Sequence, residues 1–399
     1  MNKLILHVGP GKCGSSTIQS FFMSNNNPCV EDTKFIILEP KEITKINRPN
    51  PTEESIGYYT KLLNDNINPN KTLILSHEYL FDCQYSIRNI CSISSNKVAE
   101  ILIIGYTRKQ SGYLVSSYSQ WLFRLSDRVK EVNDVILNIG IDPNYFTGVE
   151  RHLIASIVND FYTARNLSNV LIINWNQYYG EIENLVSSYG VKIRCGLLPD
   201  KKSTKNLIQD FCDRTGLTIK NELLRSTNSK ANLSFNSDLI EAINNAKEFR
   251  MLTLLPNDDN DFFNNISNIM ISNTLSDDEF MFDLNRYIDS YFYSPNMELC
   301  KKFDLNKGYY EISKKCSKDE ILHIIKNEQT KRIKDNRMLK KYKELNGAMA
   351  ELFFNYYKSQ QKENIVQANP KNSVKSSEKN FGNYYLVSWL KNELKRIFR

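Results

Sequence analysis

Five short apolar runs, each bounded by polar or turn residues, recur along the first half of the chain. They lie at residues 3–8, 34–38, 72–76, 100–106 and 169–175. Longer stretches with apolar residues at helical spacing separate several of these runs. Short continuous apolar strands that alternate with helices are typical of a parallel sheet covered on both faces. The pattern therefore predicts an α/β fold with a central parallel sheet flanked by helices, and such sheets bind ligands beyond the carboxyl ends of their strands.

The second half of the chain has a different pattern. Residues 200–310 are mostly of helical period. The stretch "SKDE", with Ser317 as N-cap and Glu320 three residues later, predicts the start of a long Lys/Glu-rich helix that ends near residue 362. We therefore expect four regions, which are a globular domain over 1–310, a charged helical extension over 311–365, a polar linker over 366–380 and a basic amphipathic helix over 381–399.

The formal net charge of +7 is concentrated near the C-terminus. Residues 311–399 contain 20 Lys and Arg against 10 Asp and Glu, whereas residues 1–310 contain 32 against 35. A basic amphipathic helix suits an anionic surface, so one expectation is peripheral contact of 381–399 with the inner face of a membrane. The alternative is that the C-terminal helices pack on the domain or form a homo-oligomer. We expect no nucleic-acid partner.

The composition is typical of a soluble globular protein. Of the 399 residues, 41% are hydrophobic, and no window approaches the roughly 20 apolar residues that a membrane-spanning helix needs. The first apolar run is interrupted by "GPGK" too early for a secretion signal, so we expect a cytoplasmic location. The eight cysteines form no C-x-x-C pair and are not spaced near the four histidines as zinc ligands are, so we expect free thiols and no metal site.

The stretch "LHVGPGKCGSST" at 6–17 is a glycine-rich loop between an expected strand and an expected helix. Backbone N–H groups and the positive end of the helix dipole meet in such a loop, and Lys12 adds a mobile charge, so the stretch predicts an anion site. Gly9 and Gly14 match the pattern G-x-x-x-x-G, but serines follow where a nucleoside-triphosphate loop has Lys-Ser/Thr. A purely structural turn is the alternative.

A second candidate anion site follows the strand "EILIIGYTR". Arg108 ends this strand, and Ser116 lies eight residues later on an expected helix. A guanidinium and a hydroxyl are suitable donors for a phosphate. Two anion sites at the ends of separate strands indicate a ligand with phosphates at both ends.

These segments resemble the nucleotide motifs of sulfotransferases that use 3′-phosphoadenosine 5′-phosphosulfate (PAPS). "HVGPGKCGSST" is similar to the family's 5′-phosphosulfate loop, and "YTRKQSGYLVSSYSQ" is similar to its 3′-phosphate motif. Weaker similarity to bacterial carbohydrate-type members extends to 228–240 and 293–303, so the resemblance covers about residues 1–310. Cys13, Ser15 and Ser16 stand where the family has threonines, and the two serines keep the hydroxyl groups.

The resemblance implies a P-loop-like sulfotransferase fold that transfers a sulfuryl group from PAPS to an acceptor hydroxyl without a metal. The implied acceptor is a sugar in a surface polysaccharide or glycolipid precursor. Lys12 is implied to stabilise the charge on the leaving oxygen. The residues implied to hold the 5′-phosphosulfate are Gly9, Lys12, Gly14, Ser15, Ser16 and Thr17, and those implied to hold the 3′-phosphate are Arg108 and Ser116.

The acceptor hydroxyl also needs a base. "LILSHEYLFD" places Glu78 and His77 just after the third strand, and we expect Glu78 as the base, with His77 as second choice. Two other functions stay open. A small-molecule kinase would need Lys-Ser/Thr after Gly14 and acidic metal ligands at a strand end, and a non-catalytic nucleotide-binding scaffold would recruit partners through the tail.

Overall fold

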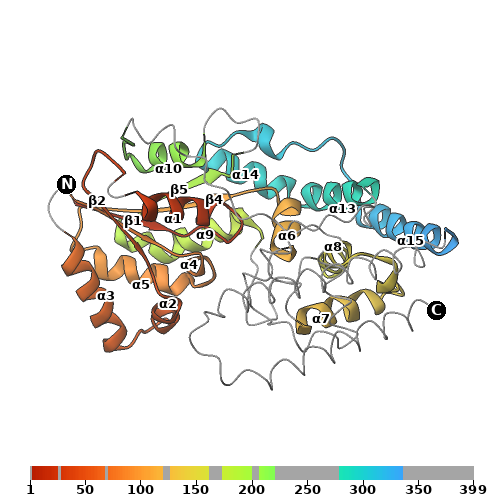
Figure 1. Cartoon of the computed structure of the whole chain (residues 1–399), viewed down its shortest axis with the longest axis horizontal. Helices are drawn as coiled ribbons and strands as arrows, with labels where there is room; N and C mark the ends of the chain where they lie inside the picture. Colours follow the sequence, from red (N-terminus) through yellow and green to blue (C-terminus); the bar gives the residue numbers. More distant parts are fainter. Residues whose placement is uncertain are drawn as a thin grey trace, which may run out of the picture. The chain divides into compact units, whose positions relative to one another are not determined.

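The computed structural model describes residues 2–25, 28–67, 71–119, 126–160, 173–199, 206–220 and 278–335. Its described strands form one sheet in the order β2-β3-β1-β4-β5, and every pair is parallel (Figure 1). The strands are β1 (Lys3–His7), β2 (Thr33–Ile37), β3 (Thr72–Ser76), β4 (Glu100–Thr107) and β5 (Lys192–Leu197). The predicted α/β class with a central parallel sheet is confirmed.

The first four apolar runs each form a strand, but the fifth strand comes from another part of the chain. The prediction of a strand that reaches Trp175 is wrong, because Asn174 caps helix α9 (Trp175–Val186) and Trp175 is its first residue. Residues 169–172 of that run lie outside the described residues. The observed β5 has the sequence "KIRCGL", in which exposed Lys192 and Arg194 interrupt the apolar residues. An edge strand that is only partly buried carries this weaker pattern.

The described α-helices are α1 (Ser15–Ser24), α2 (Pro40–Ile46), α3 (Glu53–Asn66), α4 (Tyr79–Asp82), α5 (Gln84–Ser94), α6 (Gln110–Tyr118), α7 (Ser126–Leu137), α8 (Gly148–Val158), α9, α10 (Leu207–Thr215), α13 (Asp278–Tyr291), α14 (Tyr293–Phe303) and α15 (Lys318–Lys334). Short 3-10 helices are η2 (Pro143–Tyr145), η4 (Ser187–Tyr189) and η6 (Lys307–Tyr310). Ser317 accepts a hydrogen bond from the backbone N–H of Glu320, so the predicted N-cap of α15 is confirmed.

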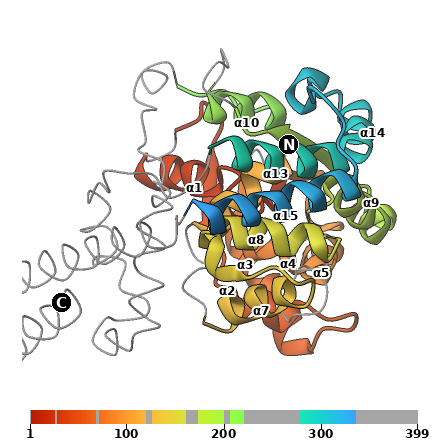
Figure 2. The ribbon, with the colours of Figure 1, turned by 90° about the vertical axis from the view of Figure 1, so that its right-hand side faces the viewer.

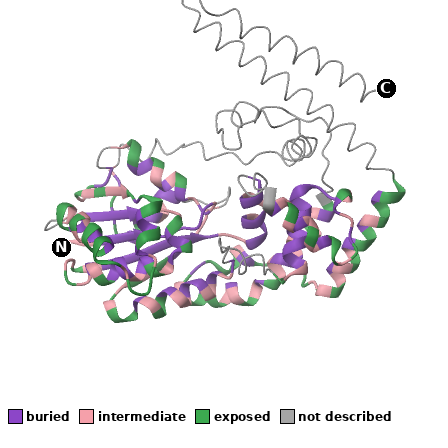
Figure 3. Cartoon of the chain, turned by 90° about the horizontal axis from the view of Figure 1, so that it is seen from below, coloured by how far each residue is buried: buried purple, intermediate pink, exposed green. Residues whose placement is uncertain are grey.

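Helices cover both faces of the sheet. α1 and α10 contact each other on one face, while α5 packs against α3 and α9 on the other (Figure 1). The central strands β1, β3 and β4 are buried along almost their whole length (Figure 3). Because the apolar surface removed from water stabilises a fold by roughly 25 cal/mol per Å², these strands form the main core and give the sheet edge a rigid base.

α15 joins the body of the fold through a buried charge cluster. It lies beside α13 and α8 (Figure 2), and Arg332 makes a two-pronged bond with Glu150 of α8, both contacts being 2.8 Å. Glu328 accepts a third bond from Arg332 at 2.6 Å. All three side chains are buried. Losing one partner of such a cluster costs about 3–5 kcal/mol, so the start of the predicted charged extension is firmly attached.

By its contacts the chain divides into two compact units, residues 1–258 with 270–348 and residues 259–269 with 349–399. All described residues belong to the first unit. The linker expected at 366–380 and the helix expected at 381–399 lie outside the described residues and stay predictions, as do the domain boundaries. Within the described ranges, every helix is too short or too polar to cross a lipid bilayer.

Candidate functional site

Three of the predicted site segments meet at one edge of the sheet. β1 is the central strand, with β3 on one side and β4 on the other, and the last residues of β1 and β3 are paired in the register. The loop 8–14 therefore lies between the segment that carries His77 and Glu78 and the segment that begins with Arg108. This is the carboxyl edge, where parallel sheets bind ligands.

The loop after β1 turns tightly into helix α1. Lys12 and Gly14 both have positive φ, 68° and 91°, and Gly14 directly precedes the first helical residue. A Cβ at Gly14 would lie 2.4 Å from Leu207 Cδ2 of α10, so both the backbone angle and the space require glycine. The loop therefore ends at the N-terminus of α1, where the helix dipole favours a negative charge.

The side chains of the loop have three different environments. Ser15 is buried and donates long hydrogen bonds to the carbonyl oxygens of Gly9 and Pro10, at 3.3 and 3.4 Å. Ser16 is exposed, and Thr17 is half-buried one residue later on α1. The predicted hydroxyl groups therefore all lie in the first turn of α1.

Cys13 fills the interior of the loop. Its side chain is fully buried, and burial raises the pKa of the thiol to about 12 although Arg108 and Lys12 lower it. The thiol is therefore protonated at neutral pH and unreactive. Its role is to pack.

Arg108, which directly follows β4, contacts the loop 8–14. Its Nη1 donates a hydrogen bond to the carbonyl oxygen of Lys12 at 3.3 Å, and its own carbonyl oxygen accepts from Trp175 Nε1 at 2.8 Å. The guanidinium lies over Gly112 of α6, where a Cβ would be only 2.8 Å from Nη2. Ser116 follows Gly112 by one helical turn and is half-buried on the same face. The structure thus brings Arg108 to both the loop and the helix face of Ser116.

The two predicted bases differ in what they can accept. Glu78 is half-buried at the N-cap position of α4. His77 Nδ1 accepts a hydrogen bond from the backbone N–H of Tyr79 at 2.9 Å. Burial lowers the pKa of His77, although Glu78 raises it, so the ring is neutral with its proton on Nε2. In that form Nε2 is a donor, so the geometry favours a carboxylate over His77 as the base.

Asp82 is a second carboxylate that the sequence reasoning missed. It lies one turn after Glu78, and desolvation together with the Glu78 charge raises the pKa of Asp82 to about 7. Its side chain reaches solvent although the surrounding protein is dense enough to desolvate the carboxylate. The i, i+4 spacing of the two acids was the signal available in the sequence.

Tyr113 of α6 connects the loop with the carboxylates. It is buried, and burial raises the pKa of its hydroxyl well above the usual value, with further contributions from Cys13, Asp82 and Glu78. Tyr113 therefore lies within electrostatic range of both Cys13 in the loop and the two carboxylates. The edge therefore combines anion donors with a titratable acid pair.

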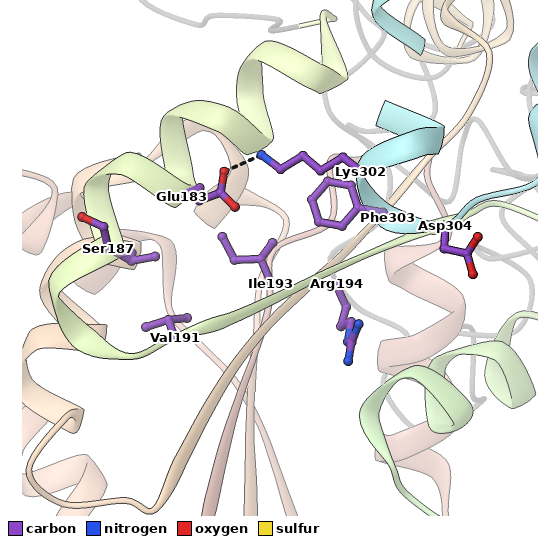
Figure 4. A pocket seen from close by; sticks show the side chains of 9 residues that line it. Glu183, Ser187, Val191, Ile193, Arg194, Lys302, Phe303 and Asp304 are labelled. Carbon is purple, nitrogen blue, oxygen red and sulfur yellow. Dashed lines mark hydrogen bonds and ion pairs between the residues drawn. The ribbon is translucent and has the colours of Figure 1, made fainter. Parts of the chain in front are cut away.

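The cavity that the described residues enclose lies away from this edge of the sheet. A cavity of about 320 Å³ lies at the start of β5, where Lys302 of α14 pairs with Glu183 of α9 (Figure 4). It is at the opposite end of β5 from the candidate site. Within the described ranges, no group of three His, Cys, Asp or Glu side chains is arranged to hold a metal ion.

The described site thus brings Lys12, Arg108 and the N-terminus of α1 together at the carboxyl edge of the sheet. It also has Asp82, whose raised pKa of about 7 lets its carboxylate accept a proton near neutral pH. Comparisons of the chain with models of protein families, with curated proteins and with solved structures found no match.

Proposed function

We propose that this protein is a PAPS-dependent sulfotransferase that transfers a sulfuryl group to an acceptor hydroxyl. The observation that carries the proposal is the contact of Arg108 with the phosphate loop, together with its position over Gly112. A loop alone would hold one phosphate, whereas a guanidinium on the neighbouring strand end supports binding of a second, separate phosphate group. PAPS has this arrangement, with a 5′-phosphosulfate and a 3′-phosphate.

Each residue of the site has a separate role in this proposal. The first N–H groups of α1, with Ser15, Ser16 and Thr17, hold the 5′-phosphosulfate, and Arg108 with Ser116 holds the 3′-phosphate. Lys12 stabilises the negative charge that develops on the bridging oxygen as its bond to sulfur breaks. A carboxylate removes the proton of the acceptor hydroxyl as the new sulfur–oxygen bond forms.

For the base we propose the pair Glu78 and Asp82 in place of a single residue. Desolvation, together with repulsion by the Glu78 charge, raises the pKa of Asp82 to about 7, so Asp82 is suited to accept a proton at neutral pH. The resemblance supplies the acceptor class, a sugar hydroxyl of a polysaccharide or glycolipid precursor, and the early interruption of the first apolar run supports a cytoplasmic location.

A kinase receives less support from the loop. Lys12 lies two residues before Gly14, and serines occupy the positions where a triphosphate loop has its lysine and its magnesium-binding hydroxyl. A scaffold without catalysis would bind the nucleotide but not remove its sulfuryl group.

Calorimetry with 3′-phosphoadenosine 5′-phosphate (PAP) and with ADP tests the proposal. We expect PAP to bind much more tightly, and Arg108→Ala to weaken PAP binding by about 1.5–3 kcal/mol while leaving ADP binding nearly unchanged. Lys109→Ala removes an equal charge one residue away, where the ammonium group donates to the carbonyl oxygen of Glu311, and serves as the matched control. Equal affinity for PAP and ADP would remove the 3′-phosphate site and with it the proposal. Labelled PAPS offered with surface glycans then identifies the acceptor.

A further inference from the structure

His7 lies directly beneath the phosphate loop and is not used in the chemistry proposed above. It is the last residue of the central strand β1 and is 1% exposed. Its Nδ1 is 2.8 Å from Ser76 Oγ of β3, and the edge of its ring meets Phe211 of α10. The ring is therefore held in one orientation.

The other ring nitrogen faces the loop without a partner. Among the described residues no group forms a hydrogen bond with His7 Nε2, although this atom is buried. A Cβ built on Gly9 would lie 3.1 Å from Nε2 and 2.7 Å from Ser15 Oγ. Both polar atoms thus flank the same side of Gly9, at the start of α1.

The hydrogen bonds around Ser76 accommodate a neutral His7 ring whose proton is on Nε2. Gln19 Nε2 of α1 donates to Ser76 Oγ at 3.2 Å, so this oxygen already acts as an acceptor. The Ser76 hydrogen is then free to point to His7 Nδ1, and in that arrangement the ring proton is on Nε2. Burial lowers the pKa of His7 to about 4, so the ring is neutral at pH 7.

We infer that His7 is a positioning residue for the bound anion, the last fixed donor of a directed chain of hydrogen bonds. Gln19 donates to Ser76, Ser76 donates to His7, and His7 Nε2–H donates to Ser15 Oγ when the anion is bound. Ser15 then turns its hydrogen from the carbonyl oxygens of the loop, where its bonds are long, to an oxygen of the phosphate. Binding satisfies a buried donor that is unpaired in the free protein.

This inference rests on the proposed function for the presence of a phosphate in the loop. His7 acts only through Ser15, so its contribution to anion binding is coupled to that of Ser15. Each hydroxyl in the chain accepts one hydrogen bond and donates the next, so the donor strength of Ser15 toward the anion depends on His7.

A double-mutant cycle with PAP as the probe tests the coupling. His7→Asn keeps an acceptor where Nδ1 was and removes Nε2, and we expect about fivefold weaker PAP binding. Ser15→Ala is expected to weaken binding by about tenfold or more. The change His7→Asn in the Ser15→Ala background should then have almost no further effect. Additive losses would overturn the inference, because His7 would act independently of Ser15.

His7→Gln is the matched rescue variant, since its side-chain amide places a donor near the position of Nε2. We expect it to bind PAP better than His7→Asn at equal thermal stability, and the opposite order would contradict the inference. If His7→Asn does not fold, Ser76→Ala removes the preceding link and replaces it in the cycle.

Two-bond ¹H–¹⁵N correlation spectra of the wild-type ring provide a test without any ligand. A proton on Nε2 is expected, and a proton on Nδ1 would overturn the chain. Failure of the wild type to bind PAP at all would instead refute the proposed function, so the two failures are distinguishable.

Discussion

Lys12 is the residue that the proposed chemistry needs most. It has a left-handed backbone conformation between the buried Cys13 and the rest of the loop, which fixes where its side chain starts. Charge appears on the bridging oxygen only in the transition state, so Lys12→Ala should reduce turnover by about 100-fold or more while PAP binding changes less. Rates with labelled PAPS and the identified acceptor, measured beside PAP affinity, check this. An equal loss in both quantities would mean that Lys12 only binds.

Asp82 and Glu78 give a prediction about pH. A base acts in its deprotonated form, so turnover should rise with pH through about 7, the raised pKa of Asp82. Glu78→Gln removes the negative charge that raises this pKa, so the pKa should fall and the acid limb of the profile should move to lower pH. The measurement is kcat/KM against pH between 5 and 9, an interval of about two units on either side of the pKa.

Asp82→Asn is the companion variant for that profile. It should abolish the limb near pH 7 and most of the turnover, while PAP binding stays intact. Glu78 is the charge that acts on Asp82, and Asp82 in turn raises the pKa of Tyr113 of α6, Tyr178 of α9 and the adjacent Cys83. An unshifted limb in Glu78→Gln would show that the base lies elsewhere.

The sequence was informative for residues that belong to a local motif and silent for those defined by the fold. Lys12 and Ser15 could be named as candidate anion-binding residues because the glycine-rich loop and the start of the helix lie in one continuous stretch of sequence. The titration of Asp82 depends on Glu78 one turn away and on desolvation by other elements. The hydrogen bond that occupies His77 Nδ1 comes from the backbone N–H of Tyr79, and the sequence does not reveal this contact.

At the level of elements, α6 positions Arg108 because residue 112 is glycine. An added Cβ would be 2.8 Å from Nη2 and 3.2 Å from Nε, so Gly112→Ala should displace the guanidinium from its place over the helix. We expect PAP affinity to fall by about tenfold, the lower end of the range for a hydrogen bond to a charged group. Stability should rise by about 0.5–1 kcal/mol, because alanine replaces glycine within a helix. Calorimetry and chemical denaturation measure the two opposite changes.

Gly57→Ala is the control for this pair of effects. Gly57 is also within a helix, α3, and a Cβ there would meet nothing within 4 Å. The Gly57→Ala variant should show the same increase in the free energy of unfolding and leave PAP binding unchanged. A loss of stability in Gly112→Ala with PAP affinity retained would contradict the positioning of Arg108 by the glycine.

The elements that the sequence predicted are those buried on both sides. β1, β3 and β4 are continuous apolar runs because helices cover both faces of the sheet. β5 was missed because its first half is mostly exposed. Trp175 was assigned to the end of a strand because it is apolar, but it is a buried residue at the start of helix α9. A short apolar run cannot by itself distinguish a strand from a buried helix start.

For the whole molecule, the parallel order β3-β1-β4 is what turns three separate sequence motifs into one site. Adjacent parallel strands end at the same edge, so motifs about 30 to 100 residues apart in the chain become neighbours there. Arg332 bonds Glu150 of α8 and so attaches α15, which ends at Lys334, to the body of the fold.

The last prediction concerns residues 381–399, which lie outside the described residues. Trp389 and its neighbours form an apolar face at helical spacing, and four basic residues, Lys391, Lys395, Arg396 and Arg399, accompany it. If this segment lies on a membrane, it should bind vesicles with anionic lipid in a salt-sensitive way, and each cation should contribute about 1 kcal/mol. Changing all four to glutamine should then lower the affinity for such vesicles, measured by sedimentation, by about a hundredfold or more. Neutral vesicles should bind neither the wild type nor this variant. A protein that ignores anionic vesicles, but loses an oligomer or its stability when 381–399 is deleted, would assign the segment to packing between or within chains.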